Sequence, residues 1–312
     1  MAELHQHPKL SPGAEFALTF LVAGLGFTLV GPLIGFFMAI PFFEGGLTEQ
    51  VTKLADPESF PELRLPLLIM QGAATLIGLA LMPSLFRFAV RGEWIGSWFT
   101  GKKMYGMMVL VASVMTIAFM GTNSVFIDWN AHLSFPEGMK GFETWARLSE
   151  DRAESLTKFM TQFPTVGDFL LGIFVIAVLP GIGEELVFRG MLQSQLAVIT
   201  KNNHAAIWIS AILFSAFHLQ FFGFVPRMLL GAFFGYLYYW SGNLLMPMIA
   251  HFVNNGFSVM MLYLHQKGVV DVDLDAPDAA PWPAVLIFTL VGGGLLYYYK
   301  NFYADKRALN GQ

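Results

Sequence analysis

Eight predominantly apolar runs, separated by short polar stretches, dominate the hydrophobic pattern of this 312-residue chain. A helix that crosses a bilayer needs roughly 20 apolar residues, and the third to sixth runs are shorter than that. We predict an all-α polytopic membrane protein with about eight transmembrane helices, in which the short helices are buried inside the bundle. The runs are Phe16–Ile40, Leu65–Phe86, Met107–Gly121, Val166–Leu179, Ala205–Leu219, Val225–Trp240, Leu244–Leu264 and Trp282–Tyr299.

The charges between the runs predict an orientation. Loops rich in Lys and Arg stay in the cytoplasm. Basic residues follow the second and the eighth runs, whereas the loops Glu44–Arg64 and Lys267–Ala280 are rich in acids. Both termini are therefore predicted to be cytoplasmic, as an even number of spans requires. The basic residues are Arg87, Arg91, Lys102, Lys103, Lys300, Lys306 and Arg307.

The segment Trp129–Phe163 has mixed charge and is predicted to form an amphipathic helix outside the bilayer. A plain connector is favoured over a segment that guides substrate. No tandem repeat or linker divides the chain, so we treat residues 1–312 as a single membrane domain.

Composition narrows the functional classes. Hydrophobic residues make up 55% of the chain and charged residues 13%, and the net charge is −4. With no basic patch, nucleic acid is not an expected partner. The chain has no cysteine, which excludes disulfides, thiolate zinc sites and a cysteine nucleophile.

Two adjacent acids are the main candidate for chemistry. Glu184 and Glu185 are the only acidic residues between Asp168 and Asp271, in a stretch otherwise fit for lipid. Carboxylates at membrane depth usually face a bundle interior or a water cavity and indicate function. Glu185 and Arg189 are four residues apart and able to pair, whereas Glu184 points about 100° away around the helix. Glu184 would then be free to act as a base; the alternative is a buried ion pair that only fixes helix packing.

The sequence Pro180-Gly181-Ile182-Gly183 comes just before these acids. Proline and glycine break or kink helices and free backbone groups. We therefore predict that the fourth span is interrupted here, beside a polar cavity that satisfies the freed backbone groups.

Two histidine clusters follow on later helices. The turn at Lys201–His204 would bring His218 to a depth similar to that of Glu184. His251 and Asn255 share a helix face and could bind an oxyanion, or could instead form an interhelical hydrogen bond. By position along their helices, His218 and His251 could lie at different depths. Lys201, His204 and Arg227 are assigned to solvated or snorkelled positions.

The three clusters together resemble the signature of the CPBP family, the CAAX-processing and bacteriocin-processing intramembrane endopeptidases, also called the Abi family. The resemblance covers roughly residues 166–264, which we regard as a protease-like core. Order and internal spacing all match. The clusters are Glu184-Glu185-xxx-Arg189, Phe214-xxx-His218 and His251-xxx-Asn255.

The resemblance implies an eight-helix membrane endopeptidase with a water-filled cavity. We expect a bacterial plasma-membrane protein, with a eukaryotic or archaeal prenyl protease as the alternative. In this role Glu184 would activate a water with help from His218, and His251 and Asn255 would stabilise the oxyanion. Glu185 and Arg189 would orient the others. No cofactor is certain. Glu184, His218 and His251 could equally hold a zinc ion with an open water position, so metal dependence stays open.

The implied partners are membrane lipid and a peptide or membrane-protein substrate. No histidine is followed by glutamate, so the zinc-protease motif His-Glu-xx-His is absent. Two other classes of function stay open. One is a non-catalytic immunity or scaffold protein. The other is a proton-coupled transporter, although no paired broken helices are found in the two halves.

Overall fold

The computed structural model describes residues 10–99, 103–271 and 278–309, and the side chains of residues 307 and 309 lie outside this description. Lys102, the side chain of Arg307 and part of the loop Lys267–Ala280, all used above to predict orientation, therefore lie outside the described residues. All regular structure within the described ranges is helical. The predicted all-α fold is confirmed.

Six helical segments of the described chain are long and apolar enough to cross a membrane. Two further helices, α11 (Asn203–Phe217) and α12 (Phe224–Ser241), complete the bundle, so each of the eight predicted runs coincides with a helical segment. The six segments are Pro12–Phe42, Pro61–Arg91, Gly106–Ala131, Val166–Thr200, Leu245–Gln266 and Trp282–Lys306.

Several of these segments contain α-helices joined by π-helical or 3-10 stretches. Besides α11 and α12, the helices α3 and α7 lie between the segments. The first segment contains α1 (Pro12–Leu25) and α2 (Gly31–Ala39), and the second contains α4 (Arg64–Ala73) and α5 (Met82–Arg91). The others are α3 (Leu47–Lys53), α6 (Gly106–Ala131), α7 (Lys140–Met160), α8 (Val166–Gly172), α9 (Leu179–Glu185), α10 (Ser194–Thr200), α13 (Leu245–Gln266) and α14 (Trp282–Leu309).

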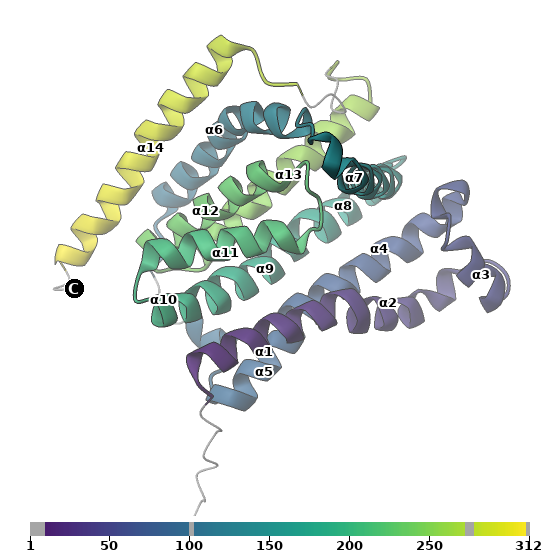
Figure 1. The fold of residues 1–312 in the computed structure, drawn as a ribbon, viewed down its shortest axis with the longest axis horizontal. Helices are drawn as coiled ribbons and strands as arrows, with labels where there is room; N and C mark the ends of the chain where they lie inside the picture. The colour runs from purple at the N-terminus through teal and green to yellow at the C-terminus, as the bar shows by residue number, and fades with distance from the viewer. Residues whose placement is uncertain (1–9, 100–102, 272–277, 310–312) are drawn as a thin grey trace, which may run out of the picture.

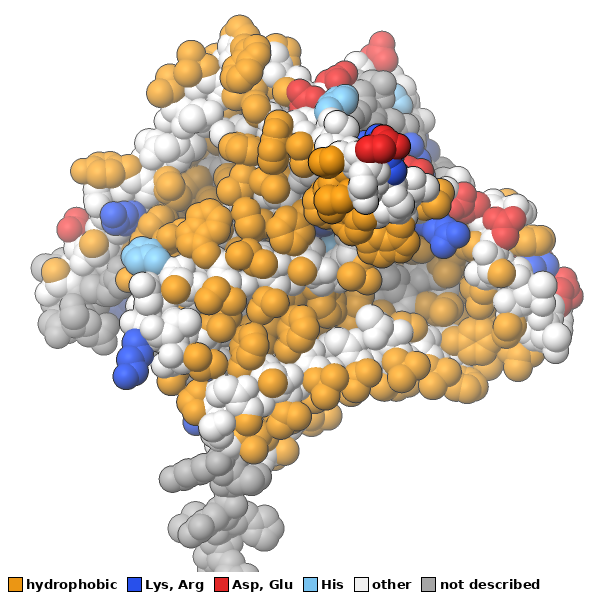
Figure 2. All heavy atoms as spheres, viewed as in Figure 1, with side chains coloured by type: hydrophobic (Ala, Val, Ile, Leu, Met, Phe, Trp, Pro, Cys, Tyr) orange, Lys and Arg blue, Asp and Glu red, His pale blue; other side chains and the backbone are white. Residues whose placement is uncertain are grey.

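The helices α8 to α13 form the centre of the molecule, with α14 and α6 on one side and the pair formed by α1–α2 and α4–α5 on the other (Figure 1). On the face shown in Figure 2, apolar side chains cover most of the bundle, and charged side chains gather near its ends. An apolar belt between two charged rims is the surface expected of a protein surrounded by lipid.

The predicted shortness of the third and fourth spans is wrong. Helix α6 has 26 residues, and the fourth segment has 35. The apolar run in α6 ends early because its last turns carry polar residues, which neighbouring helices satisfy. Asn123 donates to the carbonyl of Pro226 at 3.2 Å, and Asn130 accepts from the backbone N–H of Val225 at 2.8 Å.

The predicted interruption at Pro180 is also wrong, because the helix continues from Val166 to Thr200. Pro180 lies in the first turn of α9, directly after the π-helical stretch η8 (Ile173–Val178). In an α-helix Pro180 would leave the carbonyl of Ile176 without its usual donor, four residues on. The amide of Asn255 donates to that carbonyl at 3.1 Å, so a side chain of α13 satisfies the freed backbone group.

Gly181 and Gly183 let other helices approach this segment from two sides. A Cβ atom on Gly181 would lie 3.2 Å from backbone atoms of Met248 and Phe252 in α13. One on Gly183 would lie 3.1 Å from Leu79, in the π-helical stretch η5 (Ala74–Leu81). The two glycines therefore serve close packing: Gly181 lets α13 lie directly against the helix that carries Glu184 and Glu185, and Gly183 does the same for η5.

The predicted amphipathic helix in the segment Trp129–Phe163 is α7. It is seen end-on in Figure 1, so it runs across the bundle helices. It contacts the loop between α11 and α12: Glu150 accepts from the backbone N–H of Phe222 at 3.1 Å, and the guanidinium of Arg147 lies 4.1 Å from the ring centre of Phe222. Helix α7 is thus tied to the loop that directly follows His218.

Candidate active site

Glu184 lies in the last turn of α9, where its carboxylate faces two imidazoles. Its Oε2 atom is 4.0 Å from Nε2 of His218 and 3.9 Å from Nε2 of His251. Among the described residues, Oε2 is buried and has no hydrogen-bond partner. Separations near 4 Å are too long for direct hydrogen bonds, but one water molecule can bridge them.

A hydrogen bond fixes each imidazole. His218 is the first residue after α11, and its Nδ1 lies 2.8 Å from the carbonyl of Phe214. His251 lies in α13, and its Nδ1 lies 2.8 Å from Oε1 of Glu185. Both acceptors are oxygens without a proton to give, which assigns the proton to Nδ1 in each ring. Nε2 of both rings is therefore the atom presented to Glu184.

Glu185 and Arg189 form the ion pair predicted from their spacing. Arg189 Nη1 donates to Glu185 Oε1 at 2.7 Å, and Arg189 Nη2 donates to the carbonyl of Gly231 in α12 at 2.9 Å. The side chain of Glu185 is 0% exposed and that of Arg189 is 1% exposed. A pair this deeply buried is costly unless its hydrogen bonds are satisfied. The rings of Phe214 and Phe234 also contact the Arg189 guanidinium, with centres at 4.6 and 5.4 Å.

The buried pair positions His251. Glu185 Oε1 accepts from both Arg189 and His251, so one carboxylate oxygen joins the fourth segment to α13. The His251 ring also stacks on Phe234 of α12, with ring centres 5.1 Å apart. A carboxylate on Nδ1 holds the ring orientation and stabilises a positive charge on the imidazole if one forms.

The structure thus brings five of the six predicted site residues into one connected cluster. The anticipated difference in depth between His218 and His251 does not arise, because both reach the same oxygen of Glu184. Asn255 lies apart from this oxygen: its amide donates to Ile176, and its Oδ1 accepts from Asn254 at 3.0 Å. Its position matches the interhelical hydrogen bond considered above as the alternative to oxyanion binding.

Arg227, assigned above to a solvated position, is instead part of the surroundings of the site. Its Nη2 donates to the side chain of Gln220 at 2.8 Å, and its Nη1 is buried. Sequence reasoning missed this residue because its conformation depends on the turn at Gly223. The available signal was that Gln220 and Arg227 are the two long polar side chains between α11 and the body of α12.

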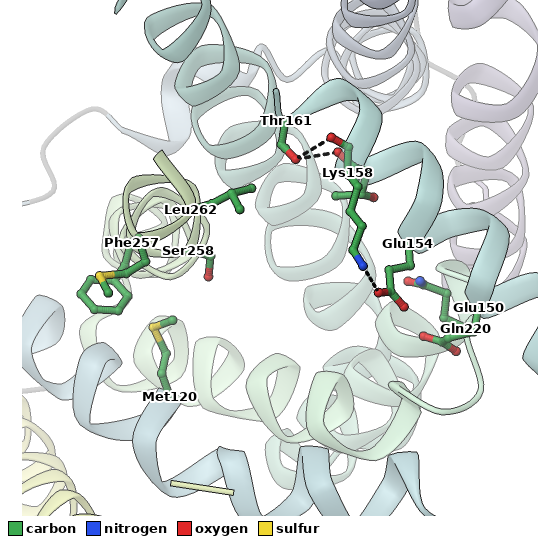
Figure 3. Close-up of a pocket in the computed structure, with 11 residues that line it drawn as sticks. Met120, Glu150, Glu154, Lys158, Thr161, Gln220, Phe257, Ser258 and Leu262 are labelled. Carbon is green, nitrogen blue, oxygen red and sulfur yellow. Dashed lines mark hydrogen bonds and ion pairs between the residues drawn. The ribbon is translucent and has the colours of Figure 1, made fainter. Parts of the chain in front are cut away.

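A cavity of about 550 Å³ opens beside this region, between α7, α13, α6 and the loop after α11 (Figure 3). Its polar lining comes mainly from α7 and the loop, and its opposite wall is formed by α13. Lining residues include Glu150, Glu154, Lys158, Gln220, Phe257 and Ser258. A second cavity of about 410 Å³ shares Phe257 and is otherwise almost wholly apolar.

The residues do not form a metal-binding group as they are placed. Two imidazole nitrogens and one carboxylate oxygen are donors that zinc accepts. Neighbouring ligands of a tetrahedral zinc lie about 3.3 Å apart, given bonds of roughly 2.0–2.1 Å. The separations of 3.9 and 4.0 Å exceed that, and no group of three His, Asp or Glu side chains in the described chain could hold a metal ion.

Comparison with known proteins identifies the core. Residues 166–257 match the family described as Type II CAAX prenyl endopeptidase Rce1-like, and this range includes all six predicted site residues. The core is thus similar to this family over these residues. The predicted resemblance to CAAX-processing endopeptidases is thereby confirmed.

Two curated relatives each match part of this chain. The uncharacterized protein YpbD of Bacillus subtilis is 31% identical over 85 residues, which are 26% of this chain and 40% of that protein. The membrane-embedded CAAX protease MroQ of Staphylococcus aureus is 29% identical over 103 residues, 31% of this chain and 41% of MroQ. The chain thus matches about two fifths of the length of each relative. No solved structure matches it.

Proposed function

We propose that this protein is an intramembrane endopeptidase in which Glu184 activates a water molecule that hydrolyses a peptide bond. The observation that carries the proposal is the convergence of Glu184 Oε2 and the two Nε2 atoms on one point. The Rce1-like core and the protease MroQ among its relatives support this reaction class.

The proton inventory of the cluster supports a hydrolytic role. With both Nδ1 atoms protonated, neutral imidazoles present lone pairs at Nε2, and an ionised Glu184 presents lone pairs as well. One water molecule has two protons to donate to these three acceptors. In the proposed mechanism one further proton is placed on Nε2 of His251, whose Nδ1 lies 2.8 Å from Glu185 Oε1.

The steps follow from this arrangement. Glu184 removes a proton from the bridging water, and the water oxygen attacks the carbonyl carbon of the substrate. The protonated Nε2 of His251 donates to the oxyanion, while His218 holds the water in position. Glu184 then passes its proton to the amide nitrogen, and the C–N bond breaks. General-base assistance of this kind contributes about 10²- to 10⁴-fold in rate.

In this proposal Glu185, Arg189 and Asn255 are positioning residues. Glu185 orients His251 directly, and Arg189 holds Glu185 in a buried ion pair. Asn255 holds α13 against the helix that carries Glu184, through its bond to Ile176. A direct contact between Asn255 and the oxyanion stays a prediction.

The proposed substrate is a membrane-associated protein or peptide, and the remaining proposed partner is lipid. The apolar cavity of about 410 Å³ beside the polar one supports a substrate with a hydrophobic portion. We also propose a bacterial plasma-membrane location with both termini in the cytoplasm, on the basis of the loop charges.

The test compares membranes and secreted peptides from cells that express wild type or Glu184→Gln, by proteomics of newly formed termini. Glu49→Gln is the matched control, because Glu49 is an exposed glutamate of α3 that pairs with Lys53 and lines neither cavity. A peptide trimmed by wild type and the control, but not by Glu184→Gln, supports the proposal. Identical termini in all three, with each variant folded, contradict it and favour a non-catalytic role.

A further inference from the structure

Arg227 lies in the first turn of α12 with one donor left over. Its guanidinium lies against Gly223, where a Cβ atom would be 2.9 Å from Nη2 and 3.4 Å from Nη1. Nη2 donates to Gln220 at 2.8 Å, which fixes the plane of the group. Nη1 is buried and has no hydrogen-bond partner among the described residues. A buried donor without a partner is costly, more so when it is charged.

Among the residues that the structure describes, no carboxylate forms an ion pair with Arg227. Glu150 and Glu184 both interact with it electrostatically, yet neither carboxylate forms an ion pair with it. Glu150 instead accepts from the backbone N–H of Phe222. Arg189, the other arginine of this region, has Glu185 as its partner. Arg227 therefore has a charged donor available to bind an anion, and the described chain does not supply that anion.

The position of Arg227 indicates where that anion would come from. Its hydrogen-bond partner Gln220 and its neighbour Glu150 both line the cavity of about 550 Å³, where Figure 3 shows them side by side. Its other charged neighbour is Glu184. Arg227 is thus joined to a lining residue of the cavity by a hydrogen bond, and it also interacts electrostatically with the carboxylate that we assign to water activation.

We propose that Arg227 binds the C-terminal α-carboxylate of the substrate, with Gln220 orienting the guanidinium. The proposal rests on the endopeptidase function proposed above. CAAX motifs stand at the C-terminus, so the carboxylate follows the scissile bond by only a few residues. Three extended residues span roughly 10 Å. A charge-assisted hydrogen bond at that distance would select substrates that are cleaved near a free C-terminus.

The experiment uses the full-length protein in lipid nanodiscs and farnesylated, internally quenched peptides. Two peptides differ only at the C-terminus, which is a carboxylate in one and a carboxamide in the other. A third is a carboxamide with glutamate as its last residue, to separate an α-carboxylate from an acidic side chain. For wild type we expect kcat/KM to be roughly 10- to 100-fold higher for the acid than for either carboxamide, mainly through KM.

Three variants test the assignment. Arg227→Gln should bring the ratio of acid to amide close to one, with kcat at saturation changed only a few-fold. Arg227→Lys should keep part of the preference. Arg152→Gln is the matched control, because Arg152 is an exposed arginine of α7, and it should leave the ratio unchanged. Equal cleavage of acid and amide by wild type would overturn the proposal, and efficient cleavage of the glutamate peptide would overturn the assignment to the C-terminus.

A binding measurement separates this proposal from the proposed function. If wild type cleaves none of the peptides, farnesylated C-terminal peptides are not its substrates, and the endopeptidase function is decided by the proteomic comparison described above. Arg227 is then tested with a fluorescent, N-acylated apolar tripeptide as acid and as amide, bound to Glu184→Gln and to Glu184→Gln with Arg227→Gln. Tighter binding of the acid that disappears in the double variant supports the carboxylate site. Equal binding of acid and amide refutes it.

Discussion

The hydrogen bond from Asn255 to Ile176 predicts an energetic coupling between Asn255 and Pro180. Asn255→Ala removes the side-chain donor that lies 3.1 Å from the Ile176 carbonyl at membrane depth. Interhelical hydrogen bonds in membranes contribute about 0.6 kcal/mol on average and about 1.7 kcal/mol at most. Because Ile176 is four residues before a proline, we expect a cost near the upper end, about 1–2 kcal/mol.

Pro180→Ala restores a backbone N–H that can bond to Ile176. Asn255→Ala should therefore cost less in the Pro180→Ala background, with a coupling of about 1 kcal/mol in a double-mutant cycle. The assay is reversible unfolding of the protein in mixed micelles, followed by helix content. Additive costs, with no coupling beyond error, would refute the assignment of Asn255 to the carbonyl freed by proline.

Activity in the same four proteins distinguishes the two roles of Asn255. A positioning role predicts that Pro180→Ala recovers most of the activity lost in Asn255→Ala. If Asn255 instead donates to the oxyanion, the loss should be about 10²- to 10³-fold and should persist in the double variant.

Three further predictions concern packing, pH and orientation. Gly181→Val should destabilise the protein by about 1–3 kcal/mol and lower activity, since its side chain would enter the backbone of α13; unfolding and hydrolysis assays check this, and full stability would contradict the close packing. Burial raises the pKa of Glu150 in α7, so the folded state binds its proton more tightly than the unfolded state does. The stability from this group is present below the unfolded pKa of about 4.3 and is lost as pH rises through the folded pKa. Glu150→Gln, which keeps an acceptor for Phe222, should therefore be more stable than wild type above that window, with the gain shrinking at lower pH in unfolding assays. A gain independent of pH would contradict this origin. Since the chain has no cysteine, single cysteines report orientation directly: Lys201→Cys should react with an impermeant maleimide only from the cytoplasmic side, and Thr48→Cys only from the opposite side. Labelling of both from one side would overturn the predicted topology.

Local sequence patterns predicted the parts of the structure that depend on local physics. The apolar runs correspond to the helices, and the spacing of four residues predicted the pair Glu185–Arg189. The order and spacing of the three motifs predicted that Glu184, His218 and His251 form one cluster. They did not predict the depth of His251 in the membrane. That depth depends on how closely α13 approaches the fourth segment, which Gly181 permits.

The features that the sequence did not reveal arise from contacts between distant residues. Asn255 and Ile176 are 79 positions apart, and only the packed bundle shows that this side chain satisfies a carbonyl near Pro180. The continuity of the fourth span depends on a π-helical stretch that absorbs the proline, which composition does not predict. Arg227 was predicted to be a solvated or snorkelled residue at the start of a helix, because nothing in the local sequence shows that its guanidinium lies against Gly223.

The most direct test of the central claim is hydrolysis of a farnesylated CAAX peptide by purified wild type, Glu184→Gln and Glu49→Gln in nanodiscs, with and without a zinc chelator. We predict that wild type and Glu49→Gln cleave the peptide and that Glu184→Gln is slower by about 10²- to 10⁴-fold while it unfolds at a similar temperature. We also predict that the chelator leaves the wild-type rate unchanged. Cleavage by folded Glu184→Gln at the wild-type rate would contradict water activation by Glu184. Loss of wild-type activity on chelation, restored by zinc, would replace it with a metal-dependent mechanism.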